Sequence, residues 1–168
     1  MTAHLPHSAH PLPEGGLALV IGASGGIGEA LLTRLQQDAR FARVLGLSRH
    51  SQPTLDLQDE TSIAQAAAHV AGLGVPLRLL IDATGLLHGQ GLQPEKSWQQ
   101  LDPVTMAQAF AINAIGPALL MKHFLPLLPR EGRSVFATLS AKVGSIGDNR
   151  LGGWYSYRAS KAALNQLV

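Results

Sequence analysis

A tyrosine and a lysine near the end of the chain have the types and the spacing for proton-transfer chemistry. Tyr157 and Lys161 are four residues apart within residues 155–168, which the sequence pattern predicts to be helical. Their side chains are therefore expected on one face of that helix, one turn apart. A phenol has a pKa of about 10, and a nearby ammonium group favours the phenolate and lowers that pKa. Because the Tyr-x-x-x-Lys spacing is frequent by chance, its meaning depends on a second motif.

A glycine-rich turn near the start of the chain supplies that second motif. Gly22, Gly26 and Gly28 follow a short apolar run, 17–21, and precede a segment with helical spacing, 27–38. Glycines in such a turn allow close approach of the backbone to a pyrophosphate, toward which the helix N-terminus points its free N–H groups. The alternative is an ordinary loop in a chain with 18 glycines. The position of the turn between a strand and a helix favours dinucleotide binding.

The end of the second predicted strand, 44–48, indicates which dinucleotide is bound. An acidic residue there would accept a hydrogen bond from the ribose 2′-hydroxyl, whereas an arginine would hold a 2′-phosphate. The strand is followed by Arg49 and no carboxylate. We therefore predict that NADP(H) is favoured over NAD(H), the alternative being that Arg49 is an ordinary solvated surface residue.

The order of apolar and amphipathic segments predicts the fold that positions these residues. Strands are expected at 17–21, 44–48, 54–57, 77–83 and 134–139, and helices at 27–38, 61–71, 103–125 and 155–168. Apolar strands that alternate with helices are typical of a parallel sheet covered on both faces. The prediction is an α/β fold, a Rossmann-type doubly wound parallel sheet with five strands in the order 3-2-1-4-5 and with the sixth strand and later elements absent. We expect a flexible leader at 1–16 and an NAD(P)-binding domain, incomplete at its C-terminus, at 17–168.

Composition and charge narrow the class of protein. The 168 residues are 46% hydrophobic and 14% charged, which is typical of a globular chain, and the net charge of +2 is spread without a basic stripe that would favour nucleic acid. The absence of cysteine excludes disulfides, thiol catalysis and thiolate metal sites. In the leader, His4, His7 and His10 have an even spacing, but the prolines among them prevent a helix from aligning them, so no metal site is predicted.

Neither the N-terminal residues nor the longest apolar stretch has the pattern of a targeting or membrane segment. Residues 1–16 lack the basic start and apolar centre of a secretory signal. The stretch 109–129 contains Asn113, Lys122, His123 and three prolines, which makes it a poor membrane span. We expect a cytoplasmic protein with no membrane partner.

Together the motifs resemble the short-chain dehydrogenase/reductase family from residue 17 to the end of the chain. Gly22, Gly26 and Gly28 resemble its cofactor turn, and residues 82–85 resemble the element that ends its fourth strand. The run 152–165, GGWYSYRASKAALN, and the missing helix between strands two and three are similar to the C-factor-like branch, which includes sniffer and carbonyl reductases. The resemblance implies an oxidoreductase that interconverts a carbonyl and a hydroxyl group on a small-molecule substrate by hydride transfer.

The resemblance also implies roles for individual residues. Tyr157 would donate the proton, Lys161 would hold the ribose and lower the tyrosine pKa, and Asn113 would anchor a water in the proton relay. Asp56 would contact the adenine ring. The residues expected to bind the cofactor are Gly22, Ser24, Gly26, Ile27, Gly28, Arg49, Asp56, Leu57, Ala83, Thr84, Gly85, Tyr157 and Lys161.

Three positions depart from the family pattern. Ile21 stands where a threonine is usual, and Asp82 where an asparagine is usual. The family serine falls at Ala141, so we predict that Ser140 acts instead, with a local extra residue absorbing the offset. Ser145 is the second candidate.

Two function classes follow. The first is the active NADP(H)-dependent reductase, and the second is a catalytically incompetent fragment or a non-enzymatic nucleotide-binding or signalling protein. The sequence leaves the oligomeric state open, and the resemblance implies that a homo-oligomer would pair through the long helices at 103–125 and 155–168.

Overall fold

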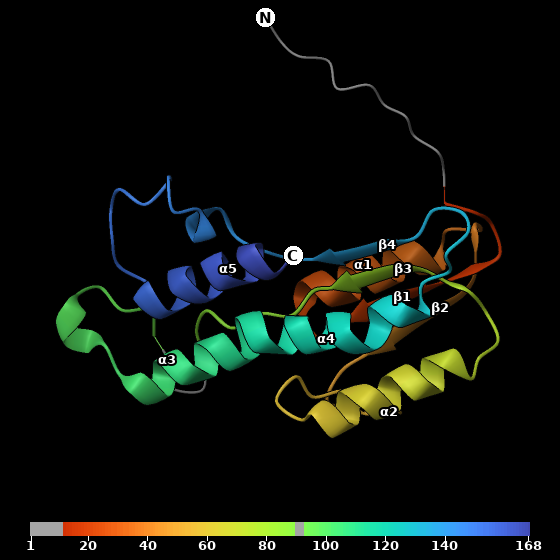
Figure 1. Ribbon diagram of the computed structural model, residues 1–168, viewed down its shortest axis with the longest axis horizontal. Coiled ribbons are helices and arrows are strands. Elements are labelled where there is room, and N and C mark those ends of the chain that lie inside the picture. The colour runs from red at the N-terminus through yellow and green to blue at the C-terminus, as the bar shows by residue number, and fades with distance from the viewer. Residues whose placement is uncertain (1–11, 90–92) are drawn as a thin grey trace, which may run out of the picture.

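The computed structural model describes residues 12–89 and 93–168, and these form a parallel sheet flanked by helices (Figure 1). Four strands, β1 (Gly16–Ile21), β2 (Phe41–Leu47), β3 (Leu77–Asp82) and β4 (Val135–Thr138), pair in the order β2-β1-β3-β4. The helices are α1 (Gly26–Gln36), α2 (Glu60–Ala71), α3 (Pro103–Phe110), α4 (Gly116–Phe124) and α5 (Tyr155–Leu167). Short 3₁₀ turns lie at Trp98–Gln100, Leu125–Leu127 and Lys142–Gly144. The predicted leader falls mostly on residues 1–11, outside the described residues, as do His4, His7 and His10.

The predicted third strand at 54–57 is wrong. Leu55 N donates to Ser48 O beyond the end of β2 (2.9 Å), but Asp56 N donates to the Ser62 hydroxyl of α2 (2.9 Å) instead of to a neighbouring strand. The apolar pattern of this segment reflects burial, because Leu55 and Leu57 belong to the core. The described residues therefore form four strands, not five in the order 3-2-1-4-5.

The central strand β1 is fully buried on both faces, which explains its unbroken apolar sequence. Leu17, Leu19 and Ile21 pack in the core cluster with side chains from α2 and α4. The other face of the sheet is covered by α1, where Leu32 closes on the position of Gly46 in β2. Ile21 is in register with Leu47 on one side and Asp82 on the other. The carboxyl ends of three strands therefore meet at one edge.

The predicted helix at 103–125 is a helical stretch with a wide π turn in its middle, at Ala111–Ile115. Pro117 has no N–H, so it cannot donate to the carbonyl of Asn113 four residues earlier. Gly116 N bonds instead to Ala111 O, five residues back. Such π turns are frequent at functional sites because they re-aim a side chain without ending the helix. Here the re-aimed residue is Asn113.

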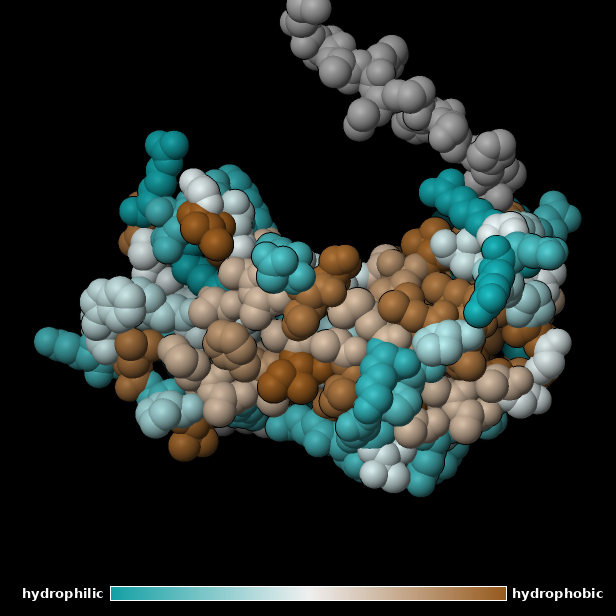
Figure 2. Space-filling view, viewed as in Figure 1, coloured by the Kyte–Doolittle hydropathy of each residue, from teal (hydrophilic) through white to brown (hydrophobic). Residues whose placement is uncertain are grey.

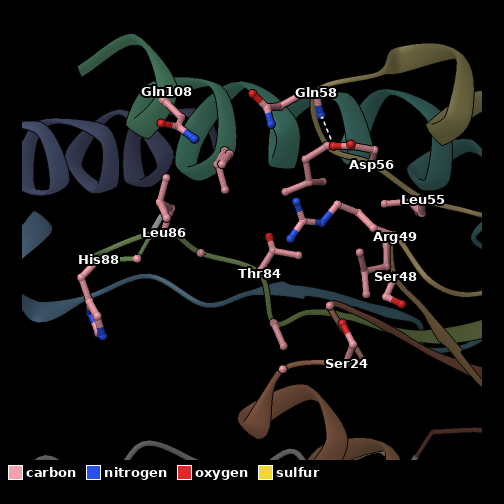
Figure 3. A pocket seen from close by; sticks show the side chains of 18 residues that line it. Ser24, Ser48, Arg49, Leu55, Asp56, Gln58, Thr84, Leu86, His88 and Gln108 are labelled. Carbon is pink, nitrogen blue, oxygen red and sulfur yellow. Dashed lines mark hydrogen bonds between the residues drawn. The ribbon is translucent and has the colours of Figure 1, made fainter. Parts of the chain in front are cut away.

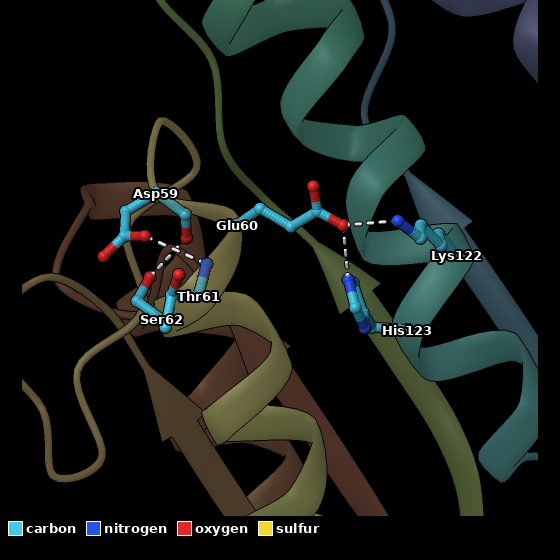
Figure 4. A network of polar contacts seen from close by, with 6 residues as sticks. All are labelled: Asp59, Glu60, Thr61, Ser62, Lys122 and His123. Carbon is cyan, nitrogen blue, oxygen red and sulfur yellow. Dashed lines mark hydrogen bonds and ion pairs between the residues drawn. The ribbon is translucent and has the colours of Figure 1, made fainter.

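An exposed ion-pair network ties α2 to α4 (Figure 4). The Glu60 carboxylate accepts from the Lys122 ammonium (2.5 Å) and lies 3.0 Å from His123 Nε2. Asp59 precedes Glu60 and caps α2 by accepting from Thr61 N (2.9 Å). These contacts hold the N-terminal end of α2 against the C-terminal turn of α4.

Apolar side chains remain on the surface formed by the long helical stretch (Figure 2). Val104, Ile115 and Leu125 are exposed there, and Leu167 and Val168 are exposed at the end of α5. Residues Pro103–Leu127 are long and apolar enough to cross a membrane by length and composition, a test that core helices of globular proteins also pass. Pairing of two chains through these helices stays a prediction.

Candidate active site

A cavity of about 330 Å³ opens where the carboxyl ends of β1, β2 and β3 meet (Figure 3). Its wall contains eight of the residues predicted to bind the cofactor: Gly22, Ser24, Arg49, Asp56, Leu57, Ala83, Thr84 and Gly85. In doubly wound sheets, ligands bind at this edge. The cavity is therefore the candidate site for a dinucleotide.

The glycine turn forms one side of the cavity, and its shape is fixed by backbone contacts. Gly22 has a positive φ of 82°, and the amides of Gly22 and Ala23 both donate to Leu47 O of β2 (2.9 and 3.2 Å). A Cβ on Gly28 would lie 2.2 Å from the Gly22 carbonyl oxygen, so only glycine fits where α1 crosses the turn. The first N–H groups of α1 have no partner within the helix and are free for an anion.

Three further residues predicted to bind the cofactor lie at the start of α1, outside the cavity wall. Gly26, Ile27 and Gly28 do not line the cavity, and Ile27 is exposed. Gly28 serves the packing of α1 on the turn, whereas Gly25, which the sequence reasoning missed, lies in the cavity wall.

Arg49 extends its guanidinium into the cavity from the end of β2 (Figure 3). Among the described residues its guanidinium has no hydrogen-bond or ion-pair partner, so its donors are free for a ligand. Asp56 stands on the adjacent wall and accepts from Gln58 N (3.0 Å). Gln58, Gln108 and His88 also line the cavity and were not predicted, because nothing in the local sequence marks them as neighbours of the turn.

Asp82, at the end of β3, braces the floor of the cavity. It is fully buried, and its carboxylate accepts from Thr84 N (3.0 Å) and Thr84 Oγ1 (2.6 Å). Its second oxygen accepts from Thr138 Oγ1 of β4 (2.7 Å). The carboxylate accepts from all three of these donors, so the departure from asparagine at this position has a structural role.

Asn113 connects the cavity wall to the helix that carries Tyr157. Its amide exchanges two hydrogen bonds with the backbone of Leu86 (2.7 and 2.8 Å), and Nδ2 also donates to Ser160 Oγ of α5 (3.1 Å). Both amide hydrogens are therefore used. A water held by Asn113 would have to use its Oδ1 or its main chain. Ser160, buried at this junction, was missed because serine at that position has no chemical signature in the sequence.

Lys161 lies beside the cavity, buried to 2% exposure. A Cβ on Gly85, which lines the cavity, would be 3.6 Å from the lysine Nζ and 3.7 Å from Asn113 Oδ1. The ammonium donates to Leu139 O (2.8 Å). Burial lowers the pKa of Lys161 below its usual value, and the charge of Asp82 offsets part of that shift.

Tyr157 is half-buried, with the Trp154 indole edge-to-face on its ring at 6.4 Å. Burial raises the pKa of the Tyr157 phenol above its usual value of 10.0. The predicted lowering by Lys161 is not found, because the ammonium is directed to Leu139 O. At neutral pH the phenol is therefore a protonated donor.

The two candidate serines, Ser140 and Ser145, follow β4 and line a second pocket. β4 ends at Thr138, before either serine, so strand alternation does not determine which way Ser140 faces. The Ser140 hydroxyl donates to Asn165 Oδ1 (2.5 Å) in a shallow pocket that Ser145 also lines. Within the described residues no hydrogen bond joins either serine to Tyr157, and the choice between them stays a prediction.

Comparison with known proteins places this arrangement in a family. The family model described as short chain dehydrogenase matches residues 16–168. A 1-hydroxy-2-glutathionyl-2-methyl-3-butene dehydrogenase of Rhodococcus sp. (strain AD45) is 31% identical over 160 residues, which cover 89% of this chain and 66% of the relative. C-signal of Myxococcus xanthus is 41% identical over 68 residues, 40% of this chain and 41% of that protein.

Solved structures agree in fold. The NADPH-bound carbonyl reductase from chicken fatty liver is 27% identical with a TM-score of 0.78, over 92% of this chain and 69% of its own. The carbonyl reductase Sniffer of D. melanogaster, 22% identical with a TM-score of 0.76 over 91% of this chain and 72% of its own, shows the same fold. The chain spans less than two thirds of the length of both curated relatives above. Since the family model nevertheless covers almost all of the described residues, the chain belongs to the short-chain dehydrogenase family.

Proposed function

We propose that the protein is an NADP(H)-dependent oxidoreductase that interconverts a carbonyl and a hydroxyl group on a small molecule. The observation that carries the proposal is the position of Gly85. It lines the cavity, and a Cβ placed on it would lie within van der Waals distance of both Lys161 Nζ and Asn113 Oδ1. Residues for cofactor binding and for proton transfer thus meet at one backbone position.

The residues of this chain fit a nicotinamide dinucleotide. The open N-terminus of α1 and the glycine turn suit a pyrophosphate, and the buried Lys161 ammonium suits the ribose hydroxyls. When bound, the cofactor supplies a hydride to the carbonyl carbon or removes one from the alcohol. The partnerless guanidinium of Arg49 favours a 2′-phosphate and hence NADP(H). The chicken carbonyl reductase, which is similar in fold, binds NADPH.

The role of Tyr157 in this reaction is to supply the proton. In the direction of reduction, the carbonyl carbon gains a hydride, the C=O π bond breaks, and the phenol transfers its proton to the oxygen, which gives the alcohol. Burial keeps the phenol protonated at neutral pH, which suits a donor.

Two matched tyrosine variants test the proposal. NADPH oxidation should be followed with a panel of aldehydes and ketones for the wild type, Tyr157→Phe and Tyr155→Phe. We expect Tyr157→Phe to lose about 10²- to 10⁴-fold in kcat while NADPH still raises the melting temperature. Tyr155→Phe should keep its activity within about threefold, because Tyr155 stacks on Trp98 and its ring is retained in the variant.

Arg49→Ala tests the cofactor preference in the same assay. The ratio of NADPH to NADH affinity should fall about 10- to 100-fold, since one charge-assisted contact to a phosphate is removed. An unchanged ratio would make the assignment of Arg49 wrong. If NADPH stabilises the wild type and no carbonyl is turned over, the nucleotide-binding alternative replaces the enzyme. If NADPH neither stabilises the protein nor is oxidised, both are rejected.

A further inference from the structure

Glu95 is a buried carboxylate that lies outside the candidate site and contacts the chain just before Tyr157. It is only 4% exposed. Its side chain accepts from both the hydroxyl and the amide of Ser156, the second at 3.3 Å. Its backbone carbonyl accepts from Trp154 N at 2.5 Å. One residue thus holds the two positions that lie three and one residues before Tyr157.

The chain that Glu95 holds has an unusual backbone. Gly152, Gly153 and Trp154 have consecutive positive φ angles of 65°, 69° and 52°. A tryptophan in the left-handed region is unfavourable by about 1–3 kcal/mol and persists only where surrounding contacts impose it. The Trp154 amide bond to Glu95 O is such a contact. Gly153 is also necessary here, because a Cβ on it would lie 3.3 Å from the same oxygen.

The segment around Glu95 is itself rigid. The Gln100 side chain accepts from Lys96 N (2.6 Å) and Ser97 N (3.3 Å), which closes a capping box on the 3₁₀ turn Trp98–Gln100. The Trp98 ring then stacks on Tyr155, with centroids 4.0 Å apart and an interplanar angle of 24°. The segment 95–100 therefore contacts the first turn of α5 through a backbone carbonyl, a carboxylate and an aromatic ring.

We propose that Glu95 is a positioning residue for Tyr157, a role that rests on the function proposed above. The carboxylate satisfies one free N–H group in the first turn of α5, that of Ser156, and the Glu95 carbonyl fixes the left-handed Trp154 whose indole packs on the Tyr157 ring. Without these contacts from Glu95, the flexible backbone of Gly152 and Gly153 would leave the start of α5 free to shift. A displacement of about 1 Å of a reacting group is enough to lower a rate about 100-fold. Glu95 positions Tyr157 through Ser156 and Trp154, without touching the reacting atoms.

Kinetics of Glu95→Ala test the proposal, with Lys96→Ala as a control in the same loop. We expect kcat of Glu95→Ala to fall about 10- to 100-fold, while KM and the Kd for NADPH stay within about threefold. Glu95→Gln keeps one acceptor oxygen and should recover at least about threefold of the lost kcat. Lys96 is exposed and contributes only its backbone amide to the turn, so Lys96→Ala should match the wild type. Equal losses in kcat and NADPH affinity, or an unchanged kcat per folded molecule, would overturn the proposal.

A spectroscopic readout separates this inference from the proposed function. The chain has two tyrosines, so Tyr157 is the single titrating phenol in a Tyr155→Phe background. In that background Glu95→Ala should move the phenolate absorbance titration toward lower pH by about half a unit or more, because a loosened α5 exposes the buried ring. This result is expected even if no carbonyl is reduced. An unmoved titration in a folded variant contradicts the positioning role, whereas an inactive wild type contradicts only the proposed function.

Discussion

The two sides of the candidate site are held by different kinds of contact. On the cofactor side, the glycine turn is held by backbone contacts: Gly25 N donates to Gly22 O (3.0 Å), the amides of Gly22 and Ala23 donate to Leu47 O, and α1 crosses directly over Gly22. On the proton-transfer side, side chains make the contacts of α5, and each contact joins residues far apart in sequence. Ser156 is held by Glu95, Ser160 by Asn113 and Lys161 by Leu139, at separations of 61, 47 and 22 residues.

This difference determines how each side tolerates change. The turn depends on close backbone-to-backbone contacts, so a single added methyl group can break it. The α5 side depends on several side chains that meet only in the folded protein, so each change should remove part of the function. Three predictions test this contrast, in order of decreasing expected effect.

The largest effect is expected at Gly28, with Gly26 as its matched control. A Cβ at Gly28 would meet the Gly22 carbonyl oxygen at 2.2 Å and its carbon at 2.8 Å, and backbone atoms cannot move aside as a flexible side chain can. Gly28→Ala should lower the free energy of unfolding by about 3 kcal/mol. At Gly26 a Cβ would meet nothing within 4 Å, so Gly26→Ala should change the free energy of unfolding by at most about 0.5 kcal/mol.

Urea denaturation of Gly28→Ala and Gly26→Ala measures the two free energies of unfolding. If the two variants are equally stable, the turn is not held by the backbone contact described, and the contrast between the two sides fails.

Asp82 joins the two sides of the site, and an intermediate effect is expected for Asp82→Asn. The amide group would face hydroxyl and N–H donors where a carboxylate oxygen now accepts, so the free energy of unfolding should fall by about 1–2 kcal/mol. The loss of the negative charge should also lower the pKa of Lys161 further, because the attraction from Asp82 now raises it. If protonated Lys161 binds the ribose, NADPH binding should weaken at a lower pH than in the wild type.

Denaturant unfolding and the pH dependence of the NADPH Kd check the Asp82 prediction. Thr138→Val is the control, because it removes one hydrogen bond and keeps the charge. It should lower stability by about 1 kcal/mol and leave the pH dependence unchanged. A pH dependence that moves equally in both variants would mean that the charge of Asp82 does not act on Lys161.

The smallest effect is expected for Glu60→Gln, far from both sides. Hydrogen bonds from Lys122 and His123 lower the pKa of Glu60 below its usual value of 4.5. A carboxyl group with a lowered folded pKa stabilises the protein fully above its unfolded pKa and loses that contribution as the pH falls through the folded pKa. The wild type should therefore melt slightly higher than Glu60→Gln at neutral pH, and the difference should vanish in acid.

Melting temperatures of the wild type and Glu60→Gln, measured from neutral to acidic pH, test this pH dependence. Glu131→Gln, at another exposed glutamate, is the control. Added salt should shrink the difference, because the pair is exposed. A difference that grows in acid would contradict the assignment of the pKa shift to this network.

The sequence by itself was enough for the α/β class, the parallel sheet, most of its elements and most of the cofactor cavity. These features depend on hydrophobic period and on glycines close together in the chain, which leave a direct trace in the sequence. The third strand, at 54–57, was predicted wrongly because burial of Leu55 and Leu57 produces the same apolar pattern as a strand, while Asp56 N between them donates to the Ser62 hydroxyl and not to a neighbouring strand.

Only the tertiary structure decided how the proton-transfer side is arranged. The hydrogen bond from Asn113 to Ser160, the bond from the Lys161 ammonium to the Leu139 carbonyl and the contacts of Glu95 with α5 all join residues far apart in sequence. The direction of the Tyr157 pKa shift also reversed, because burial and not the lysine dominates. Spacing along a helix predicts which side chains share a face, but the environment that sets their chemistry comes from the elements packed against that face.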